Sequence, residues 1–231
     1  MVREADRSRR IPTLGDKGTG MTLANDAKFW DRTSRKYASG PVADQQAYAR
    51  TLDRTRALLR PQDRVLELGC GTGSTALRLA GGVRSYLATD ISPGMIEIAD
   101  EKLAADPVPG LSFRAATAEE FDPADARFDV VLGFNYLHLV HDLPATLRQI
   151  HALLAADGAL VTKTPCLGEM NPLLRLALPL ARTLGQAPHT GVFTAGQLQA
   201  AIEAAGFAIE ASERHASRGK DTRPYLIARK R

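Results

Sequence analysis

The alternation of apolar and amphipathic segments constrains the fold of this chain more than any other feature. Beyond Pro61, short apolar runs alternate with segments of helical periodicity. Strands joined through helices pair in parallel with right-handed crossovers, so we expect a doubly wound α/β fold with helices on both faces of a mostly parallel, seven-stranded sheet. The predicted strands are 65–68, 85–89, 111–115, 128–134, 159–163, 207–211 and 223–228, and the predicted helices are 74–80, 93–105, 144–156 and 195–205.

Three segments lie outside this alternation. Residues 25–60 predict two helices separated by Gly40-Pro41, which would form an N-terminal helical cap on the sheet. Residues 166–193, rich in leucine, predict a helical, lid-like insertion after the fifth strand. Residues 1–24 combine charges with glycines and show no apolar period, so we expect a mobile arm before a single domain of residues 25–231.

Composition excludes several classes of protein. With 44% hydrophobic and 24% charged residues, the chain resembles a globular domain rather than a disordered or fibrous one. No stretch approaches the roughly 20 apolar residues that cross a bilayer, and residues 1–10 lack the apolar core of a secretory signal. We therefore expect a cytoplasmic protein without a transmembrane segment. Cys70 and Cys166 form no metal-ligand pattern, so we expect free thiols and no bound metal.

The net charge of +4 is small, and much of the excess lies near the C-terminus. Such a basic end has two interpretations: contact with nucleic acid or an anionic membrane surface, or simple solvation. Asp221 is the only acidic residue in this stretch of the sequence. The basic residues are Arg214, Arg218, Lys220, Arg223, Arg229, Lys230 and Arg231.

A glycine-rich loop, Gly69-x-Gly71-x-Gly73, follows the first predicted strand and precedes a helix. Glycines allow a tight turn that exposes backbone N–H groups, so a ligand can approach the backbone closely. Asp90 ends the next strand, close to the position of the acid that binds ribose in dinucleotide folds. Glu67 precedes the loop, and its carboxylate would repel a pyrophosphate. It suits a ligand with an ammonium group and a sulfonium centre, as in S-adenosylmethionine.

Three motifs in series carry a family resemblance: VLELGCGTG (65–73), ATDISPGMIEIA (88–99) and FDVVLGFNYLHLVHD (128–142). In order and spacing they resemble the class I, Rossmann-like S-adenosylmethionine-dependent methyltransferases over roughly residues 26–209. Within that class, the small-molecule branch that includes quinone-biosynthesis methyltransferases is the most similar. The resemblance implies S-adenosylmethionine as cofactor and methyl transfer as the reaction.

The resemblance also implies roles for single residues. Glu67 would hold the methionine ammonium group, Gly69 and Gly71 would let the methionine part lie against the loop, and Asp90 would accept hydrogen bonds from both ribose hydroxyls. Many relatives have an aspartate in place of Thr117, whose hydroxyl can still accept from the adenine amino group, which leaves adenine selectivity open. The remaining implied contacts are Ile91 and Met95 with the adenine face, Thr117 and Ala118 with its edge, and Phe134 and Asn135 with the methionine side.

In similar enzymes an N-terminal helix folds over the cofactor and delivers a tyrosine. Tyr37 is the candidate here, with Trp30 behind it; alternatively, both are core aromatics that join the helix to the sheet. Methyl transfer is an in-line displacement on an activated cofactor, so alignment can suffice without a base. His138 and His141 are candidate catalytic bases just past the fourth strand; alternatively, they pack in the helix that follows.

The leucines of residues 167–184 exceed what one helix face can bury. They predict either a lid over an apolar pocket or a homodimer surface. The expected acceptor is therefore a small, hydrophobic or aromatic molecule. One alternative is a nucleic-acid methyltransferase, to which Pro165-Cys166 is a clue, although no base-stacking aromatics or basic groove accompany it. Another is a non-catalytic protein that binds S-adenosylmethionine.

Overall fold

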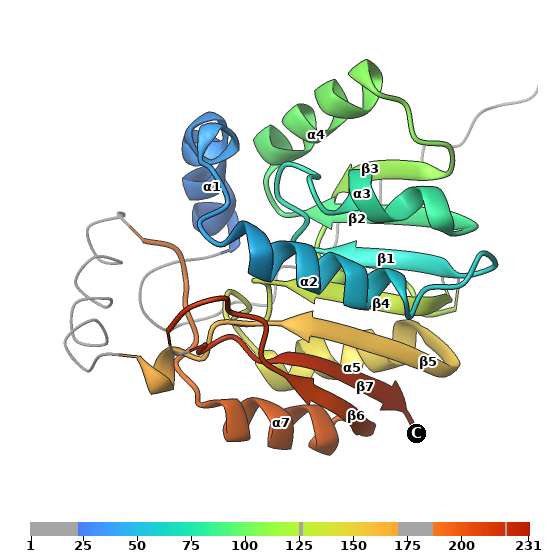
Figure 1. Cartoon of the computed structure of the whole chain (residues 1–231), viewed down its shortest axis with the longest axis vertical. Coiled ribbons are helices and arrows are strands. Elements are labelled where there is room, and N and C mark those ends of the chain that lie inside the picture. The colour runs from blue at the N-terminus through green and yellow to red at the C-terminus, as the bar shows by residue number, and fades with distance from the viewer. Residues whose placement is uncertain (1–22, 125–126, 171–186, 220) are drawn as a thin grey trace, which may run out of the picture.

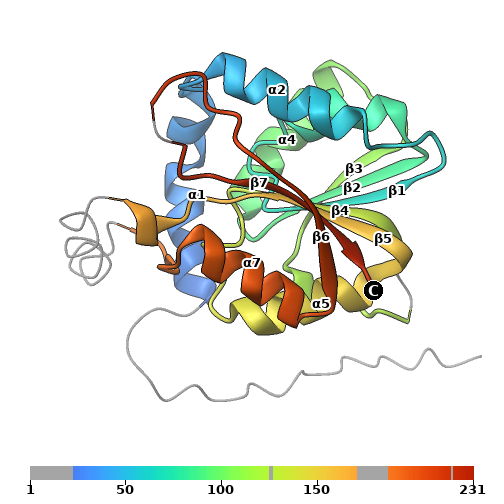
Figure 2. The ribbon, with the colours of Figure 1, turned by 60° about the horizontal axis from the view of Figure 1, so that its bottom comes forward.

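The computed structural model describes residues 23–124, 127–170, 187–219 and 221–231. These residues form a seven-stranded sheet with helices on both faces, in the strand order β3-β2-β1-β4-β5-β7-β6 (Figures 1 and 2). The strands are β1 (Arg64–Leu68), β2 (Ser85–Asp90), β3 (Leu111–Ala115), β4 (Phe128–Phe134), β5 (Leu154–Lys163), β6 (Phe207–Glu213) and β7 (Tyr225–Lys230). The helices are α1 (Leu23–Ser39), α2 (Gln45–Arg56), α3 (Ala76–Leu79), α4 (Pro93–Ala105), α5 (Leu143–Leu153) and α7 (Ala195–Ala204), with short 3-10 helices at Ala80–Gly82, Ala118–Glu120 and Leu167–Glu169.

The direction of the strands confirms a mostly parallel sheet but makes it a mixed one. Strands β1 to β5 pair in parallel, whereas β7 lies antiparallel between β5 and β6. A parallel pairing of β6 and β7 would need a crossover connection between the two strands. The described residues between β6 and β7 contain no helix that could provide one.

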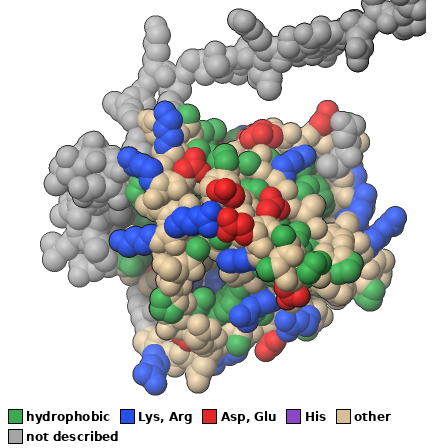
Figure 3. All heavy atoms as spheres, turned by 90° about the horizontal axis from the view of Figure 1, so that it is seen from above, with side chains coloured by type: hydrophobic (Ala, Val, Ile, Leu, Met, Phe, Trp, Pro, Cys, Tyr) green, Lys and Arg blue, Asp and Glu red, His purple; other side chains and the backbone are tan. Residues whose placement is uncertain are grey.

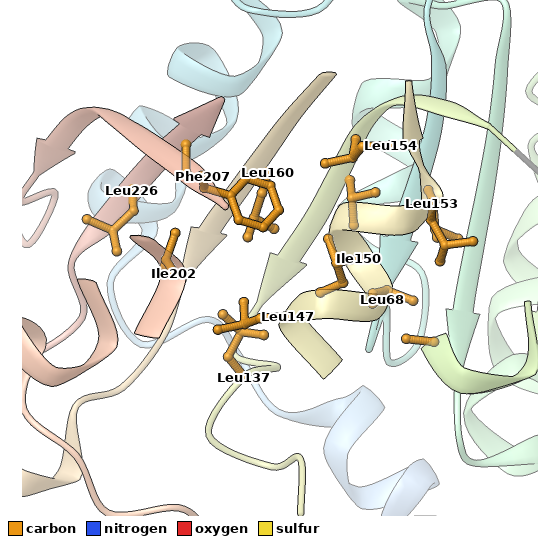
Figure 4. Close-up of a cluster of buried hydrophobic side chains, with 14 of the residues drawn as sticks. Leu68, Leu137, Leu147, Ile150, Leu153, Leu154, Leu160, Ile202, Phe207 and Leu226 are labelled. Atoms are coloured by element: carbon orange, nitrogen blue, oxygen red, sulfur yellow. The ribbon is translucent and has the colours of Figure 1, made fainter. Parts of the chain in front are cut away.

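Two apolar layers cover the two faces of the sheet. On one face, side chains of α5 and α7 pack against the sheet, as Figure 4 shows for Leu147, Ile150 and Ile202 beside Leu160 and Leu226. On the other face, α2, α3 and α4 contribute to a second cluster around β1, β2, β4 and β5. The predicted doubly wound arrangement is therefore present, and successive residues of each strand face alternate layers.

Local capping explains where the helices begin. The Ser92 hydroxyl accepts from the backbone N–H of Met95 at 3.1 Å, so α4 begins at Pro93 as predicted. Thr194 and Gln197 form a reciprocal capping box at the start of α7. The Asp44 side chain accepts from the backbone N–H of Ala47 at 2.9 Å and so caps α2, which begins at Gln45 after the break that follows Gly40.

Helix α1 is fixed over the carboxyl ends of the strands by side chains along its length. Asp31 accepts from the Ser92 hydroxyl at 2.6 Å and from the Gly94 N–H at 2.9 Å, at the N-terminus of α4. The Asp26 carboxylate is buried and lies 2.6 Å from Nε2 of His141. Figure 1 shows α1 beside α4.

Two of the predicted segments fall largely outside the described residues. The predicted arm, residues 1–24, is described only from Leu23, where α1 begins. Residues 171–186 of the predicted insertion also lie outside the described residues. The segments before and after them are joined by a hydrogen bond from the Gly168 N–H to the Phe193 carbonyl at 2.9 Å. Within the described part of the chain, none of the helices has the length and apolar character needed to cross a membrane.

Candidate active site

A cavity of about 740 Å³ lies at the carboxyl ends of β1 and β4, beneath α1 and α2. Successive side chains of a strand face opposite sides of the sheet, and this alternation explains how two polar residues reach the cavity. Glu67 shares a sheet face with buried Val65, and Lys163 shares one with buried Val161. Six residues predicted to bind the cofactor line the cavity: Tyr37, Glu67, Gly69, Gly71, Phe134 and Asn135.

The glycine loop has the backbone conformation that its sequence predicts. Gly69, Gly71 and Gly73 all have positive φ, at 69°, 55° and 76°. A Cβ at Gly73 would lie 2.6 Å from the ring of Phe113, and one at Gly69 would lie 2.8 Å from the ring of Tyr136. Both positions therefore require glycine for conformation and for space, whereas a Cβ at Gly71 would project toward Tyr37 at 3.6 Å.

The carboxyl group of Glu67 is buried beside this loop. Only 2% of the residue is exposed, and its Oε2 accepts a hydrogen bond from the Tyr86 hydroxyl at 2.8 Å. Burial raises the pKa of Glu67 to about 8, and the Tyr86 hydrogen bond offsets only part of that effect. No basic side chain of the described residues pairs with it. The site thus presents a carboxyl group without a cation.

Asp90 lies at the end of β2, where it orders the loop. Its Oδ2 accepts from the Gly71 N–H at 2.9 Å and its Oδ1 from the Ser92 N–H at 3.0 Å. Burial raises the pKa of Asp90, and these two backbone donors oppose the shift. Asp90 therefore joins the glycine loop to the start of α4.

The residues predicted to contact adenine lie beyond the lining of this cavity. Met95 and Ala118 are buried, and Ile91 and Thr117 are half-buried. The Thr117 hydroxyl donates to Glu120 Oε1 at 3.2 Å within a capping box. The hydroxyl proton is thus engaged, which leaves its oxygen as an acceptor.

Tyr37 and Trp30 both belong to the lining of the cavity. Their rings meet edge to face with centroids 6.2 Å apart, and Tyr37 is 55% exposed. Burial of the phenol group raises the pKa of Tyr37, and the nearby carboxyl group of Asp90 adds to this shift. Neither aromatic is part of the two clusters of buried side chains described above.

The two candidate bases do not line the cavity. Burial lowers the pKa of His138 to about 4, and its Nδ1 has no hydrogen-bond partner among the described residues. His141 pairs with Asp26 and stacks on His189, with ring centroids 4.1 Å apart. Asp26, which belongs to α1, also accepts from the His189 N–H at 2.9 Å. The contacts of His141 and His189 with Asp26 hold α1 in place.

The cysteines have no exposed thiol. Cys166 is fully buried and burial raises its pKa to about 11, so it is a poor nucleophile. Burial also raises the pKa of Cys70. Both are free, and the described residues contain no cluster of His, Cys, Asp and Glu that could hold a metal ion.

Sequence reasoning missed two polar residues of the site. Tyr86 is the partner of Glu67, and Lys163 lines the cavity with its ammonium group bonded to Thr51 Oγ1 at 2.9 Å. Lys163 ends a strand at the reactive edge of the sheet, with the same parity as the apolar Val161. A lysine on the buried face of a strand is the signal that could have identified it.

The chain matches the family model of a methyltransferase domain over residues 43–212. Among curated proteins, the mitochondrial arginine-hydroxylase NDUFAF5 of Mus musculus is 30% identical over 210 residues, which cover 84% of this chain and 59% of that protein. The chain thus spans less than two thirds of the length of the first curated relatives it matches.

Solved structures share the fold at low identity. Magnesium protoporphyrin IX methyltransferase (ChlM) from Synechocystis PCC 6803, with SAH bound, matches with a TM-score of 0.67 and 19% identity over 89% of this chain and 95% of that chain. DhpI in complex with SAH matches with a TM-score of 0.70 and 19% identity over 90% and 96%. The family match identifies the chain as a member of the methyltransferase domain family, and its fold and glycine loop agree with that membership.

Proposed function

We propose that the chain methylates a small, apolar or aromatic acceptor bound in the cavity beneath α1 and α2. The observation that carries this proposal is the two-sided lining of the cavity. The glycine loop and Glu67 form one side, and Phe29, Trp30 and Tyr48 belong to the helices that form the other. The volume of about 740 Å³ lies in the range of about 300–1,000 Å³ typical of small-molecule sites.

The residues present fit the cofactor. The buried Glu67 carboxyl group lacks a cation, which the ammonium group of S-adenosylmethionine would supply. Gly71 leaves a space between the loop and Tyr37 that a Cβ would fill. We therefore propose that Glu67 binds the ammonium group, and that Gly69, Gly71, Phe134 and Asn135 surround the methionine part.

The nucleoside part would follow the loop toward α4. Asp90 would accept from the ribose hydroxyls with lone pairs that the Gly71 and Ser92 N–H groups leave free. Thr117 would accept from the adenine amino group. The other proposed contacts are Ile91 and Met95 on the adenine face, Ala118 at its edge, and Tyr37 over the loop.

When bound, S-adenosylmethionine supplies an activated methyl group. The task of the chain is then to align the acceptor and exclude water. Because His138 and His141 lie outside the lining, and burial gives His138 a pKa of about 4, we propose that neither removes a proton from the acceptor.

A nucleic-acid acceptor has less support. On the face shown in Figure 3, basic and acidic side chains are interspersed. Near the C-terminus, Arg229 pairs with Glu210 at 2.9 Å, and Lys230 donates to the carbonyl oxygens of His151 and Leu154. The buried thiol of Cys166 also argues against a cytosine nucleophile.

The test is turnover on a panel of small aromatic and apolar acceptors with S-adenosylmethionine, detected by mass spectrometry. We expect SAH and a product heavier by one methyl-for-hydrogen exchange. Tight cofactor binding without turnover on any acceptor would instead indicate a non-catalytic binding protein. Salt-sensitive binding of RNA or DNA would favour a nucleic-acid substrate.

A further inference from the structure

We propose that the acceptor carries an anionic oxygen, a carboxylate or an ionised phenol or enol, and that the ammonium group of Lys163 binds it. This inference rests on the proposed function, because it specifies the chemistry of the acceptor in the same cavity.

The backbone places Lys163 next to the proposed methionine site. Lys163 pairs with Phe134 across β4 and β5, and its carbonyl accepts from the Asn135 N–H at 2.8 Å. Asn135 has a φ of 52°, a left-handed conformation that asparagine tolerates, and it ends β4 at this point. An acceptor held by Lys163 would therefore lie on the methionine side of the cofactor, which is where the methyl group must be reached.

The ammonium group has donors to spare. Lys163 Nζ donates to Thr51 Oγ1 at 2.9 Å, and an ammonium group has three N–H donors. No carboxylate of the described residues lies within 4 Å of it. Lys163 is half-buried, and burial lowers its pKa, so its charged form is only partly solvated. An anionic ligand would supply the missing partner.

Thr51 holds the ammonium group in position. Its hydroxyl donates to the Ala47 carbonyl at 2.8 Å within α2, which leaves its oxygen to accept from Lys163. Thr51 is itself buried and also contacts Nδ1 of His215 at 3.0 Å. The direction of the lysine side chain is therefore set by α2 before any ligand enters.

The nearby acids are already engaged. Asp44 accepts from Ala47 and Ser217, and these hydrogen bonds lower its pKa to about 2. Asp221 accepts from the backbone N–H groups of His215, Ala216 and Arg223. Both carboxylates raise the pKa of Lys163 through space, but neither occupies its donors.

The rest of the lining defines the body of the ligand. Most large side chains around the cavity are aromatic or apolar, so a ligand that reaches Lys163 contacts rings over most of its surface. The combination indicates an aromatic or apolar acid rather than a sugar or a nucleotide. The residues concerned are Phe29, Trp30, Tyr37, Tyr48, Leu52 and Phe134.

The experiment compares biphenyl-4-carboxylate with its neutral analogue, biphenyl-4-carboxamide, in the presence of SAH. Trp30 is the single tryptophan of the chain and lines the cavity, so its fluorescence reports binding. We expect wild type to bind the carboxylate roughly tenfold more tightly than the amide, as for one charge-assisted hydrogen bond. In Lys163→Gln that preference should be lost while SAH affinity and amide affinity are retained.

Three further variants isolate the role of the charge at this position. Lys163→Arg should keep most of the preference. Lys28→Gln removes the same charge from the exposed face of α1, outside the lining, and should leave the preference unchanged. Arg223 also lines the cavity, but its side chain is exposed to solvent, so Arg223→Gln should leave the preference unchanged as well. If Lys163→Gln does not fold, loss of the preference in Arg223→Gln or in Lys163→Arg would still overturn the proposal.

The proposal is overturned if wild type shows no carboxylate preference, if the preference survives in Lys163→Gln, or if it depends on Arg223. Failure of both probes to bind at millimolar concentration also counts against it. These readouts do not involve methyl transfer. Turnover without any carboxylate preference would therefore refute this inference alone, and a Lys163-dependent preference without turnover would refute only the proposed function.

Discussion

Binding of the cofactor to Glu67 should release a proton, which makes affinity depend on pH. The buried carboxyl group has a pKa of about 8, so it is mostly protonated at neutral pH before the ligand arrives. A ligand ammonium group binds the ionised form and stabilises it. Cofactor affinity should therefore rise with pH up to about 8.

The magnitude follows from the fraction ionised. With a pKa of about 8, roughly 1% of Glu67 is ionised at pH 6 and roughly 24% at pH 7.5. If only the ionised form binds, affinity should increase about 25-fold over this range through Glu67. In Glu67→Gln, which keeps an acceptor for the Tyr86 hydroxyl, this increase should be absent.

The assay is titration calorimetry with S-adenosylmethionine between pH 6 and 7.5. The ligand has its own α-amino group, whose ordinary pKa is about 7.7–8.0, so the ratio of wild-type to Glu67→Gln affinity is the informative quantity. Near pH 6, wild type should also release about one proton per ligand, measured in two buffers of different ionisation enthalpy. A ratio that stays constant with pH would refute the assignment of Glu67.

The same group should control the stability of the ligand-free protein. The pKa of Glu67 rises from 4.5 to about 8 on folding, so its contribution is fully present below pH 4.5 and is lost as the pH rises through about 8. The loss amounts to at most about 5 kcal/mol. Urea unfolding should show a flatter pH dependence in Glu67→Gln than in wild type, and parallel curves would contradict the raised pKa of Glu67.

Three further predictions concern single substitutions. Asp90→Ala should weaken S-adenosylmethionine binding more than tenfold in calorimetry, because a hydrogen bond to a charged group contributes roughly 1.5–3 kcal/mol; unchanged affinity would exclude Asp90 from the ribose site. His138→Ala should lower kcat about tenfold or less, and a loss of about 10²–10⁴-fold, with the acidic limb of the pH–rate profile removed, would restore it as a base. Gly73→Ala should lower the free energy of unfolding by about 2 kcal/mol or more, because its φ of 76° and the 2.6 Å approach of Phe113 leave no room for a Cβ; wild-type stability in urea would show that the loop relaxes.

The sequence predicts the local elements well where a short-range signal exists. Ser92-Pro93 starts α4 and Thr194 starts α7 at the residues expected. The glycine loop, with Glu67 before it and Asp90 after the next strand, needs only the strand–turn–helix pattern to be recognised. These features depend on hydrogen bonds and φ values within a few residues, so the local sequence determines them.

Long-range pairing is decided by the tertiary structure. The place of β7 between β5 and β6, the Tyr86 partner of Glu67 and the Asp26–His141 contact each join residues far apart in the chain. The same holds for Lys163, whose position in a strand is visible in the sequence, whereas its contact with Thr51 of α2 is not. The sequence thus determined which groups the chain possesses and on which element each lies. Only the tertiary packing decided how far each group is buried, and that burial raises the pKa of Glu67 and lowers the pKa values of His138 and Lys163.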